Sequence, residues 1–305
     1  MPVSRLNGVE IAWDVHGDPA GQTIVLIQGL GMPSAAWPPA FIERLTAGGF
    51  AVVTFDNRDV GRSECLNGMR DVTVLQSAVR RMMRIPVQAP YRLHDMAEDA
   101  LALIDLLGLE APHIVGFSMG GMIAQRVALA APGRLGSLTS VMSTTNDRNL
   151  PQPSLGLQWF LAKGGQAMTP RQRREHLRNF WKRIGSPAFP HTDEEIEAFI
   201  DRILAAGMPP AGRDRQTLAI IAEEGRGEDL GELDLPTLVI HGTDDPLVPV
   251  ECGKRTAECI PGATLRLIEG MGHDLPSGLV PILGNAIVAH AEGAALRPAQ
   301  SGRAA

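Results

Sequence analysis

The sequence predicts an α/β fold built on a doubly wound, mostly parallel sheet, and three observations support this. Short, nearly continuous apolar runs at residues 23–28, 50–55 and 112–117 are typical of strands buried on both faces of a parallel sheet. Segments with the apolar spacing of helices separate these runs, as successive βαβ units require. Asn7-Gly8 lies between two β-like runs and indicates a hairpin, which we expect at an antiparallel edge of the sheet.

The first 142 residues alternate between expected strands and helices. The strands are expected at residues 3–6, 9–16, 23–28, 50–55, 112–117 and 138–142. Helices are expected at residues 37–47, 93–107 and 119–131, and each is followed by a glycine or a Pro-Gly pair that ends it. Residues 64–92 are irregular and partly basic, and we expect a solvated loop or a short helix there.

The alternation stops after residue 142. Helices are expected at 155–167, 170–185, 192–206 and 214–224, with no β-run among them, and their block would form a cap over the strand ends. Strands resume at 236–241 and 264–268, with helices at 251–259 and 276–291. The expected division is therefore a core of residues 1–142 and 233–292, a helical cap of residues 143–232, and a flexible tail of residues 293–305.

Length, charge and cysteine content limit the class of protein. A chain of 305 residues can form one large domain with an inserted subdomain, and a net charge of −6 gives no reason to expect nucleic acid or an anionic membrane as a partner. We see no signal peptide and no apolar run long enough to span a membrane. Three cysteines without dense spacing argue against a disulfide framework, so we expect a cytoplasmic protein without a metal or cofactor.

The ends of the expected strands carry the residues that suggest chemistry. In open α/β sheets, ligands bind outside the carboxyl ends of the strands. The run ending at Phe117 leads into Ser118, within the motif Gly116-Phe117-Ser118-Met119-Gly120. A serine on a sharp strand-to-helix turn projects its hydroxyl above the sheet, and glycines two residues before and after it relieve the crowding. Ser118 is therefore the candidate nucleophile.

A serine nucleophile needs a base, and the base needs an orienting acid. Of the eight histidines, His273 is the best candidate because it follows the last expected strand on a glycine-rich loop. His241 also ends a strand, and we expect a structural hydrogen-bond donor there. Asp245, after the strand at 236–241, is the favoured acid; Asp244 and Asp147 remain alternatives, and Asp244 is expected to bridge within its turn.

Acyl transfer also needs N–H groups that stabilise an oxyanion. The backbone N–H of Met119 directly follows the nucleophile and is one candidate. The N–H of Leu30 is the other, because the glycines beside it allow the backbone to approach a ligand closely. The inserted helices carry Trp159, Phe160, Trp181, Phe189 and Phe199, and we expect these aromatic side chains to serve packing rather than substrate contact.

With these residues in place, residues 3–142 and 233–292 resemble the α/β-hydrolase superfamily, in its capped branch. The resemblance rests on the serine motif, on Gly-Thr-Asp-Asp-Pro-Leu-Val-Pro at 242–249 and on Gly-Met-Gly-His at 270–273. It implies an eight-stranded, mostly parallel sheet with helices on both faces and an inserted helical cap. Serine at position 118 excludes the aspartate-nucleophile epoxide hydrolases and dehalogenases of this superfamily.

Two loops indicate a subgroup. Residues 56–63 look like the family loop Asp-x-Arg-Gly-x-Gly-x-Ser, with Asp59 where glycine is usual. Gln28-Gly29-Leu30-Gly31-Met32 with Trp37-Pro38 looks most like the aclacinomycin methylesterase-like group. The family commonly has His-Gly where this chain has Gln28-Gly29, and we expect Gln28 to order the loop by hydrogen bonds.

The resemblance implies a serine esterase that acts on a small, apolar ester through Ser118, His273 and Asp245. The same triad could serve a C–C bond hydrolase, a lactonase or a cofactor-free perhydrolase. A member of another class, a non-catalytic ligand-binding protein with this fold, is a further alternative because a fold does not fix a function.

Overall fold

The computed structural model describes residues 1–66, 73–163 and 168–295. Eight strands form one sheet in the order β1-β2-β4-β3-β5-β6-β7-β8. They are β1 (Val3–Leu6), β2 (Val9–His16), β3 (Thr23–Ile27), β4 (Ala51–Phe55), β5 (His113–Phe117), β6 (Ser137–Val141), β7 (Thr237–Gly242) and β8 (Thr264–Ile268). β2 pairs antiparallel with β1 and β4, and all other pairs are parallel. The predicted mostly parallel sheet with an antiparallel hairpin at its edge is confirmed.

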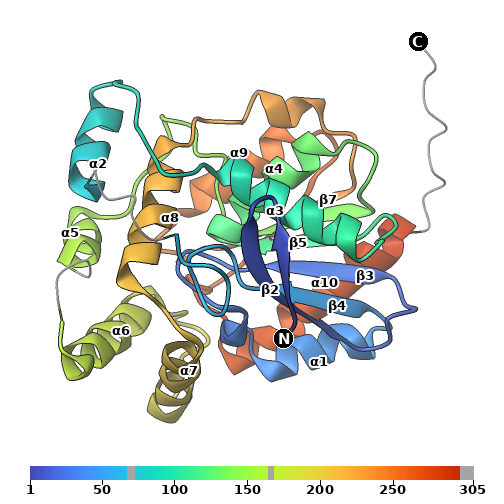
Figure 1. The fold of residues 1–305 in the computed structure, drawn as a ribbon, viewed down its shortest axis with the longest axis horizontal. Coiled ribbons are helices and arrows are strands. Elements are labelled where there is room, and N and C mark those ends of the chain that lie inside the picture. The colour runs from blue at the N-terminus through green and yellow to red at the C-terminus, as the bar shows by residue number, and fades with distance from the viewer. Residues whose placement is uncertain (67–72, 164–167, 296–305) are drawn as a thin grey trace.

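Helices cover both faces of the sheet (Figure 1). In β3, Val25 and Ile27 pack in one hydrophobic cluster and Ile24 and Leu26 in the other, because successive side chains of a strand point to opposite faces. The first cluster includes residues of α3 (Leu93–Leu106) and α4 (Met119–Ala130). The second includes residues of α1 (Pro39–Ala47) and α10 (Val280–Ala295), which pack against each other. Both faces of the sheet are therefore buried, as its apolar runs predicted.

Several helix boundaries differ from the prediction. α1 begins at Pro39 and α8 (Pro210–Ala222) at Pro210, because proline fits the first turn of a helix, where its missing N–H has no partner in any case. α2 (Val74–Met82), with a capping box formed by Thr73 and Gln76, is the short helix expected within residues 64–92. α9 (Val250–Cys259) matches its prediction within one residue, and α10 continues to Ala295, past the expected start of the tail. Residues 67–72, 164–167 and 296–305 lie outside the described part.

The inserted helices lie together on one side of the sheet, next to α2 (Figure 1). They are α5 (Leu155–Lys163), α6 (Pro170–Ile184), α7 (Asp193–Ala206) and α8, and they follow β6 and precede β7.

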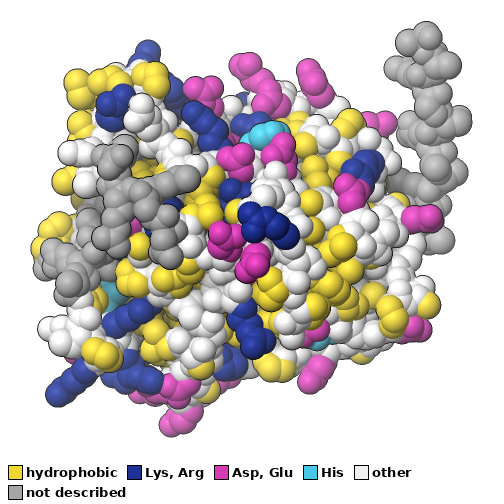
Figure 2. All heavy atoms as spheres, in the orientation of Figure 1, with side chains coloured by type: hydrophobic (Ala, Val, Ile, Leu, Met, Phe, Trp, Pro, Cys, Tyr) yellow, Lys and Arg dark blue, Asp and Glu magenta, His cyan; other side chains and the backbone are white. Residues whose placement is uncertain are grey.

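Within the described ranges, no helix combines the length and the apolar character that crossing a bilayer requires. Figure 2 shows the face of the molecule that is turned to the viewer in Figure 1. Acidic and basic side chains are interspersed over its described part, without a continuous patch of one sign.

A buried ion pair joins α8 to the core. Both oxygens of Asp59 bind the guanidinium group of Arg215, at 2.6 and 2.9 Å, and the hydroxyl group of Tyr91 donates to the same carboxylate at 2.7 Å. The side chains of Asp59 and Arg215 are 0% and 5% exposed. Asp59 has a φ of 74°, a backbone conformation that glycine adopts more easily. The aspartate at this unusual position therefore ties an inserted helix to the loop after β4.

We expect the substitution Arg215→Met to lower the free energy of unfolding by about 3 kcal/mol, because it leaves the carboxylate of Asp59 buried without its counter-ion. Chemical denaturation monitored by circular dichroism measures this change. Arg134→Met is the matched control, since Arg134 pairs with Asp105 at an exposed site and such pairs contribute about 1 kcal/mol or less. Equal changes in the free energy of unfolding for the two substitutions would contradict a stabilising ion pair between Arg215 and Asp59.

Candidate active site

Ser118 occupies a sharp turn between β5 and α4. Its backbone has φ 56° and ψ −120°, an unfavourable conformation for a residue with a side chain. A Cβ atom on Gly116 would lie 2.1 Å from the carbonyl oxygen of Gly120, and one on Gly120 would lie 2.0 Å from that of Ile27. The two glycines of the motif are therefore required by close backbone approaches, and the turn presents the hydroxyl group of Ser118 above the sheet.

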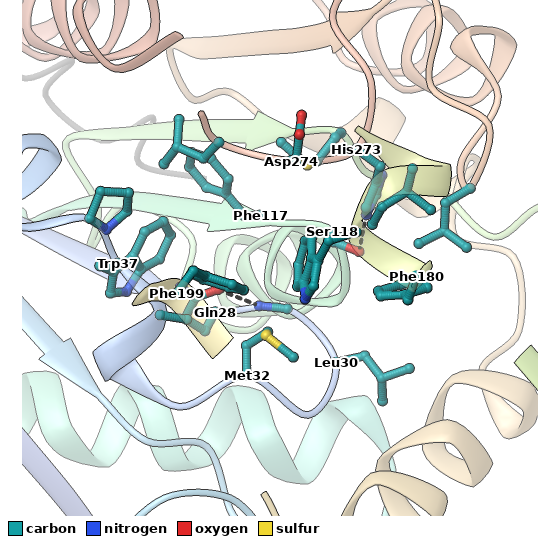
Figure 3. Close-up of a pocket in the computed structure, with 18 of the residues that line it drawn as sticks. Gln28, Leu30, Met32, Trp37, Phe117, Ser118, Phe180, Phe199, His273 and Asp274 are labelled. Atoms are coloured by element: carbon teal, nitrogen blue, oxygen red, sulfur yellow. Dashed lines mark hydrogen bonds between the residues drawn. The ribbon is translucent and has the colours of Figure 1, made fainter. Parts of the chain in front are cut away.

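Three polar side chains from separate strand ends form a hydrogen-bonded chain. Nε2 of His273 lies 2.9 Å from Oγ of Ser118, and Nδ1 of His273 lies 2.6 Å from Oδ2 of Asp245 (Figure 3 shows the Ser118–His273 contact). An ionised carboxylate only accepts hydrogen bonds, so Nδ1 carries the proton of the neutral ring. Nε2 is then free to accept a proton from Ser118. His273 and Asp245 are both buried, each 6% exposed.

The carboxylate of Asp245 is held in its ionised form. Its Oδ1 accepts hydrogen bonds from the backbone N–H groups of Leu247 and Val248, at 2.9 and 2.8 Å. Burial raises the pKa of this carboxyl group, but the imidazole rings of His273 and His241 lower it by more, so its pKa lies well below the ordinary value. Asp245 therefore keeps its negative charge beside His273 at neutral pH.

The alternative residues have other partners. Asp244 accepts hydrogen bonds from the Thr243 hydroxyl and the Gly270 N–H, so it bridges the loops after β7 and β8. Asp147 pairs with Arg255 at 3.1 Å. Nε2 of His241 lies 2.8 Å from the carbonyl oxygen of Val248 and must donate to it. None of these contacts reaches Ser118, and Asp245 is the aspartate that contacts His273.

Two backbone N–H groups beside Ser118 have no hydrogen-bond partner among the described residues. Met119 is the first residue of α4 and has no acceptor within the helix, and the N–H of Leu30 is likewise unpaired. The neighbouring groups are occupied: the N–H of Gly31 donates to Gln216 of α8, and the N–H of Gly29 donates to the side chain of Gln28. These hydrogen bonds hold the loop after β3 in place and leave the N–H of Leu30 as an unpaired donor.

A largely apolar cavity of about 190 Å³ opens onto Ser118 and His273. Aromatic side chains from the core and from the inserted helices line it, including Trp37, Phe117, Phe180 and Phe199 (Figure 3). Trp181 lines it as well. Trp181 and Phe199, which were predicted to serve packing, pack against each other and also line this cavity, and Phe180 was missed. Among the described residues, no lysine or arginine lines this cavity, and no cluster of three or more His, Cys, Asp or Glu residues could hold a metal ion.

The segment between α6 and α7 binds the loop that carries His273. The N–H of His273 donates to the carbonyl oxygen of Ile184 at 2.7 Å. The hydroxyl group of Ser186 accepts from the N–H of Gly272 at 2.8 Å and donates to Asp274 at 2.5 Å. His191 lies 3.2 Å from the same carboxylate, which is buried. Sequence reasoning missed these positions, because no local motif links residues 184–191 to the histidine loop.

Comparisons with known proteins agree with this fold. The α/β-hydrolase fold family matches residues 22–276. The rhodomycin D methylesterase DauP of Streptomyces sp. (strain C5) is 31% identical over 96% of this chain and 99% of its own. A 2-hydroxy-6-oxononadienedioate/2-hydroxy-6-oxononatrienedioate hydrolase of Paraburkholderia xenovorans LB400 is 28% identical over 85% of this chain and 84% of its own.

Among solved structures, a meta-cleavage product hydrolase from Pseudomonas fluorescens IP01 superposes with a TM-score of 0.73. It is 21% identical and covers 96% of this chain and 98% of its own, so the likeness concerns the fold. The family match over most of the chain, together with the methylesterase relatives, carries the conclusion that this chain is a hydrolase belonging to the α/β-hydrolase fold family.

Proposed function

We propose that this protein is a serine hydrolase that cleaves carboxylic esters through an acyl-enzyme. The observation that carries the proposal is the continuous hydrogen-bonded chain from Ser118 through His273 to Asp245, with contacts of 2.9 and 2.6 Å. Serine, aspartate and histidine follow one another along the chain in the order typical of this family. The inserted helices act as a cap, because Phe180, Trp181 and Phe199 close the cavity over the nucleophile.

In the first half of the reaction, Oγ of Ser118 attacks the ester carbonyl carbon and its proton passes to Nε2 of His273. The N–H groups of Leu30 and Met119 stabilise the negative charge that develops on the carbonyl oxygen. Asp245 fixes the imidazole tautomer and stabilises the positively charged ring. The bond to the alcohol then breaks, and the leaving alcohol takes the proton from His273.

In the second half, a water molecule attacks the carbonyl carbon of the acyl group on Ser118. His273 takes a proton from this water, and the same two N–H groups stabilise the second oxyanion. The bond between Ser118 and the acyl group breaks, and Oγ recovers its proton from His273. The product is a carboxylic acid, and the enzyme returns to its starting state.

The cavity supports a neutral, apolar substrate. Its lining is aromatic and aliphatic, and burying such surface favours apolar groups. Relatives such as DauP are named rhodomycin D methylesterases, and ester cleavage by this chain agrees with that similarity.

A C–C bond hydrolase with the same triad is the second candidate, because some relatives cleave dioate substrates. A dioate carries two carboxylates, which need cationic partners when they leave water. No lysine or arginine is among the described residues that line the cavity, and the carboxylate of Asp274 is buried beside it. These charges favour ester cleavage over the hydrolysis of a dianion.

The first test is the substitution Ser118→Ala. We expect it to abolish hydrolysis of p-nitrophenyl butyrate, because no other hydroxyl group contacts His273 in the described part of the chain. Release of p-nitrophenol measures the reaction, and circular dichroism verifies the fold. Ser4→Ala is the matched control, since Ser4 accepts a hydrogen bond from Trp13 in the edge hairpin. Retained turnover in Ser118→Ala would exclude the proposed nucleophile, and no turnover by the wild type would favour a non-catalytic binding protein.

The second test is the pH dependence of kcat/KM. His273 can accept the proton of Ser118 only as a neutral ring, so activity should fall as the pH decreases and the ring becomes protonated. The pKa of Asp245 is depressed, so its carboxylate stays ionised over this range. We therefore expect log kcat/KM to fall by about one for each pH unit on the acid side. A flat profile, or a slope near two, would contradict a single essential base.

The third test concerns Ser186. Ser186→Ala removes the hydroxyl group that joins Gly272 to Asp274, and the loss of such a buried link should lower kcat about tenfold by loosening the His273 loop. KM for a small ester should change less. Ser154→Ala is the matched control, because Ser154 caps α5 and has no contact with the histidine loop. Equal kcat values for Ser186→Ala and the control would exclude a positioning role.

A further inference from the structure

Gln28 enters the cavity with its amide group in a fixed orientation. The residue directly follows β3, lines the cavity and is 7% exposed. Its side-chain oxygen accepts a hydrogen bond from the N–H of Gly29 at 3.1 Å (Figure 3). A backbone N–H can only donate, so the end of the amide that faces Gly29 must be the oxygen. The amide nitrogen, Nε2, is therefore turned away from the backbone of the loop.

The donor end of this amide is uncommitted. Nε2 of Gln28 has no hydrogen-bond partner among the described residues, yet it is not one of the polar atoms sealed from solvent. By contrast, the indole nitrogens of Trp37 and Trp181 are sealed behind the cavity surface. Because Gln28 keeps its small exposed area at the cavity, Nε2 presents two N–H groups to whatever occupies it.

The donor nitrogen belongs to a residue whose neighbouring backbone contacts the nucleophile. A Cβ atom on Gly29 would lie 3.3 Å from Cβ of Ser118 and 3.8 Å from its Oγ, so the backbone beside Gln28 touches the nucleophile. The carbonyl oxygen of Gln28 is itself held by the side chain of Asn57 at 3.1 Å. Because a glutamine side chain is only a few bonds long, a substrate atom that accepts a hydrogen bond from Nε2 lies only a few bonds from the ester carbonyl.

The charges around Gln28 determine which kind of substrate oxygen can accept a hydrogen bond from Nε2. The amide of Gln28 is neutral, Asp274 is the one carboxylate among the described residues that line the cavity, and no lysine or arginine from the described part lines the wall. An anionic acceptor would lose its hydration without a counter-charge. A neutral ketone, ether or hydroxyl oxygen would gain a hydrogen bond from Nε2 and fit the apolar remainder of the cavity.

We infer that Gln28 is a specificity-determining residue whose amide Nε2 donates a hydrogen bond to a neutral substrate oxygen a few bonds from the scissile ester. The preferred substrates are therefore oxygen-bearing esters rather than purely hydrocarbon ones. This inference rests on the proposed esterase function and adds the class of substrate. It also gives glutamine at this position a role besides ordering the loop.

The test compares pairs of esters that differ in one atom. In p-nitrophenyl esters of linear acids, one methylene of the acyl chain is replaced by an ether oxygen at successive positions. In the alcohol part, 2-methoxyethyl butyrate is compared with butyl butyrate in a pH-stat. Each ratio of kcat/KM is divided by the corresponding ratio for hydroxide, which removes the inductive effect of the oxygen. The wild type should prefer the oxygen-bearing member of at least one pair by about fivefold, the size of one hydrogen bond.

Two variants remove the donor. Gln28→Met keeps the length of the side chain without any N–H group, and we expect the preference to disappear. Gln28→Glu keeps an oxygen for the N–H of Gly29 and replaces the donor with a second oxygen, so the oxygen-bearing ester should become the poorer substrate. Either variant alone suffices if the other does not fold. Met32→Leu is the matched control, because Met32 lines the same cavity without a donor, and it should keep the wild-type ratio.

Each outcome decides between the alternatives. Loss of the preference in the Gln28 variants, with the ratio kept in Met32→Leu, supports the inference. Equal loss of kcat/KM for both members of every pair, or no preference in the wild type, would overturn it and leave Gln28 as a loop-ordering residue. If the wild type cleaves no ester in a Ser118-dependent manner, the proposed function itself fails.

Discussion

The backbone turn at Ser118 is the constraint on which the rest of the structure depends. The turn requires a positive φ at Ser118 and tolerates no side chain at Gly116 or Gly120, whose backbones approach each other and Ile27 too closely. Because β5 lies centrally in a parallel sheet, the turn opens at the edge where the loops after β3, β7 and β8 also end. The proposed oxyanion donors, acid and base are thus brought together by the topology of the sheet.

The inserted helices and the segment after α6 bind the loops after β3 and β4 and the loop that carries His273. α8 holds the loop after β3 through Gln216, which binds the N–H of Gly31 and the carbonyl oxygen of Arg58, and holds the loop after β4 through the buried pair of Arg215 and Asp59. The segment after α6 holds the histidine loop through Ser186. A displacement of these helices would therefore disturb both the proposed oxyanion donors and the proposed base.

The sequence predicted the core and the candidate triad because the signals there are local. Apolar runs, the Asn7-Gly8 turn and the glycines around Ser118 depend on neighbours along the chain, and so do the loops that carry Asp245 and His273. It did not predict the contacts of Ser186 with Asp274 or of Arg215 with Asp59, since 88 and 156 residues separate these partners. The start of α8 at Pro210 was predicted four residues too late, at 214, although the start of α6 at Pro170 was predicted correctly.

The most direct measurement is the covalent reaction of the folded protein with a fluorophosphonate probe, followed by mass spectrometry of its peptides. This probe reacts with a serine only where a base activates the hydroxyl group and N–H groups stabilise the resulting oxyanion. The account predicts one adduct, on Ser118, which Ser118→Ala removes and a competing ester slows. A folded protein that forms no adduct, or forms one on another serine, would contradict the account.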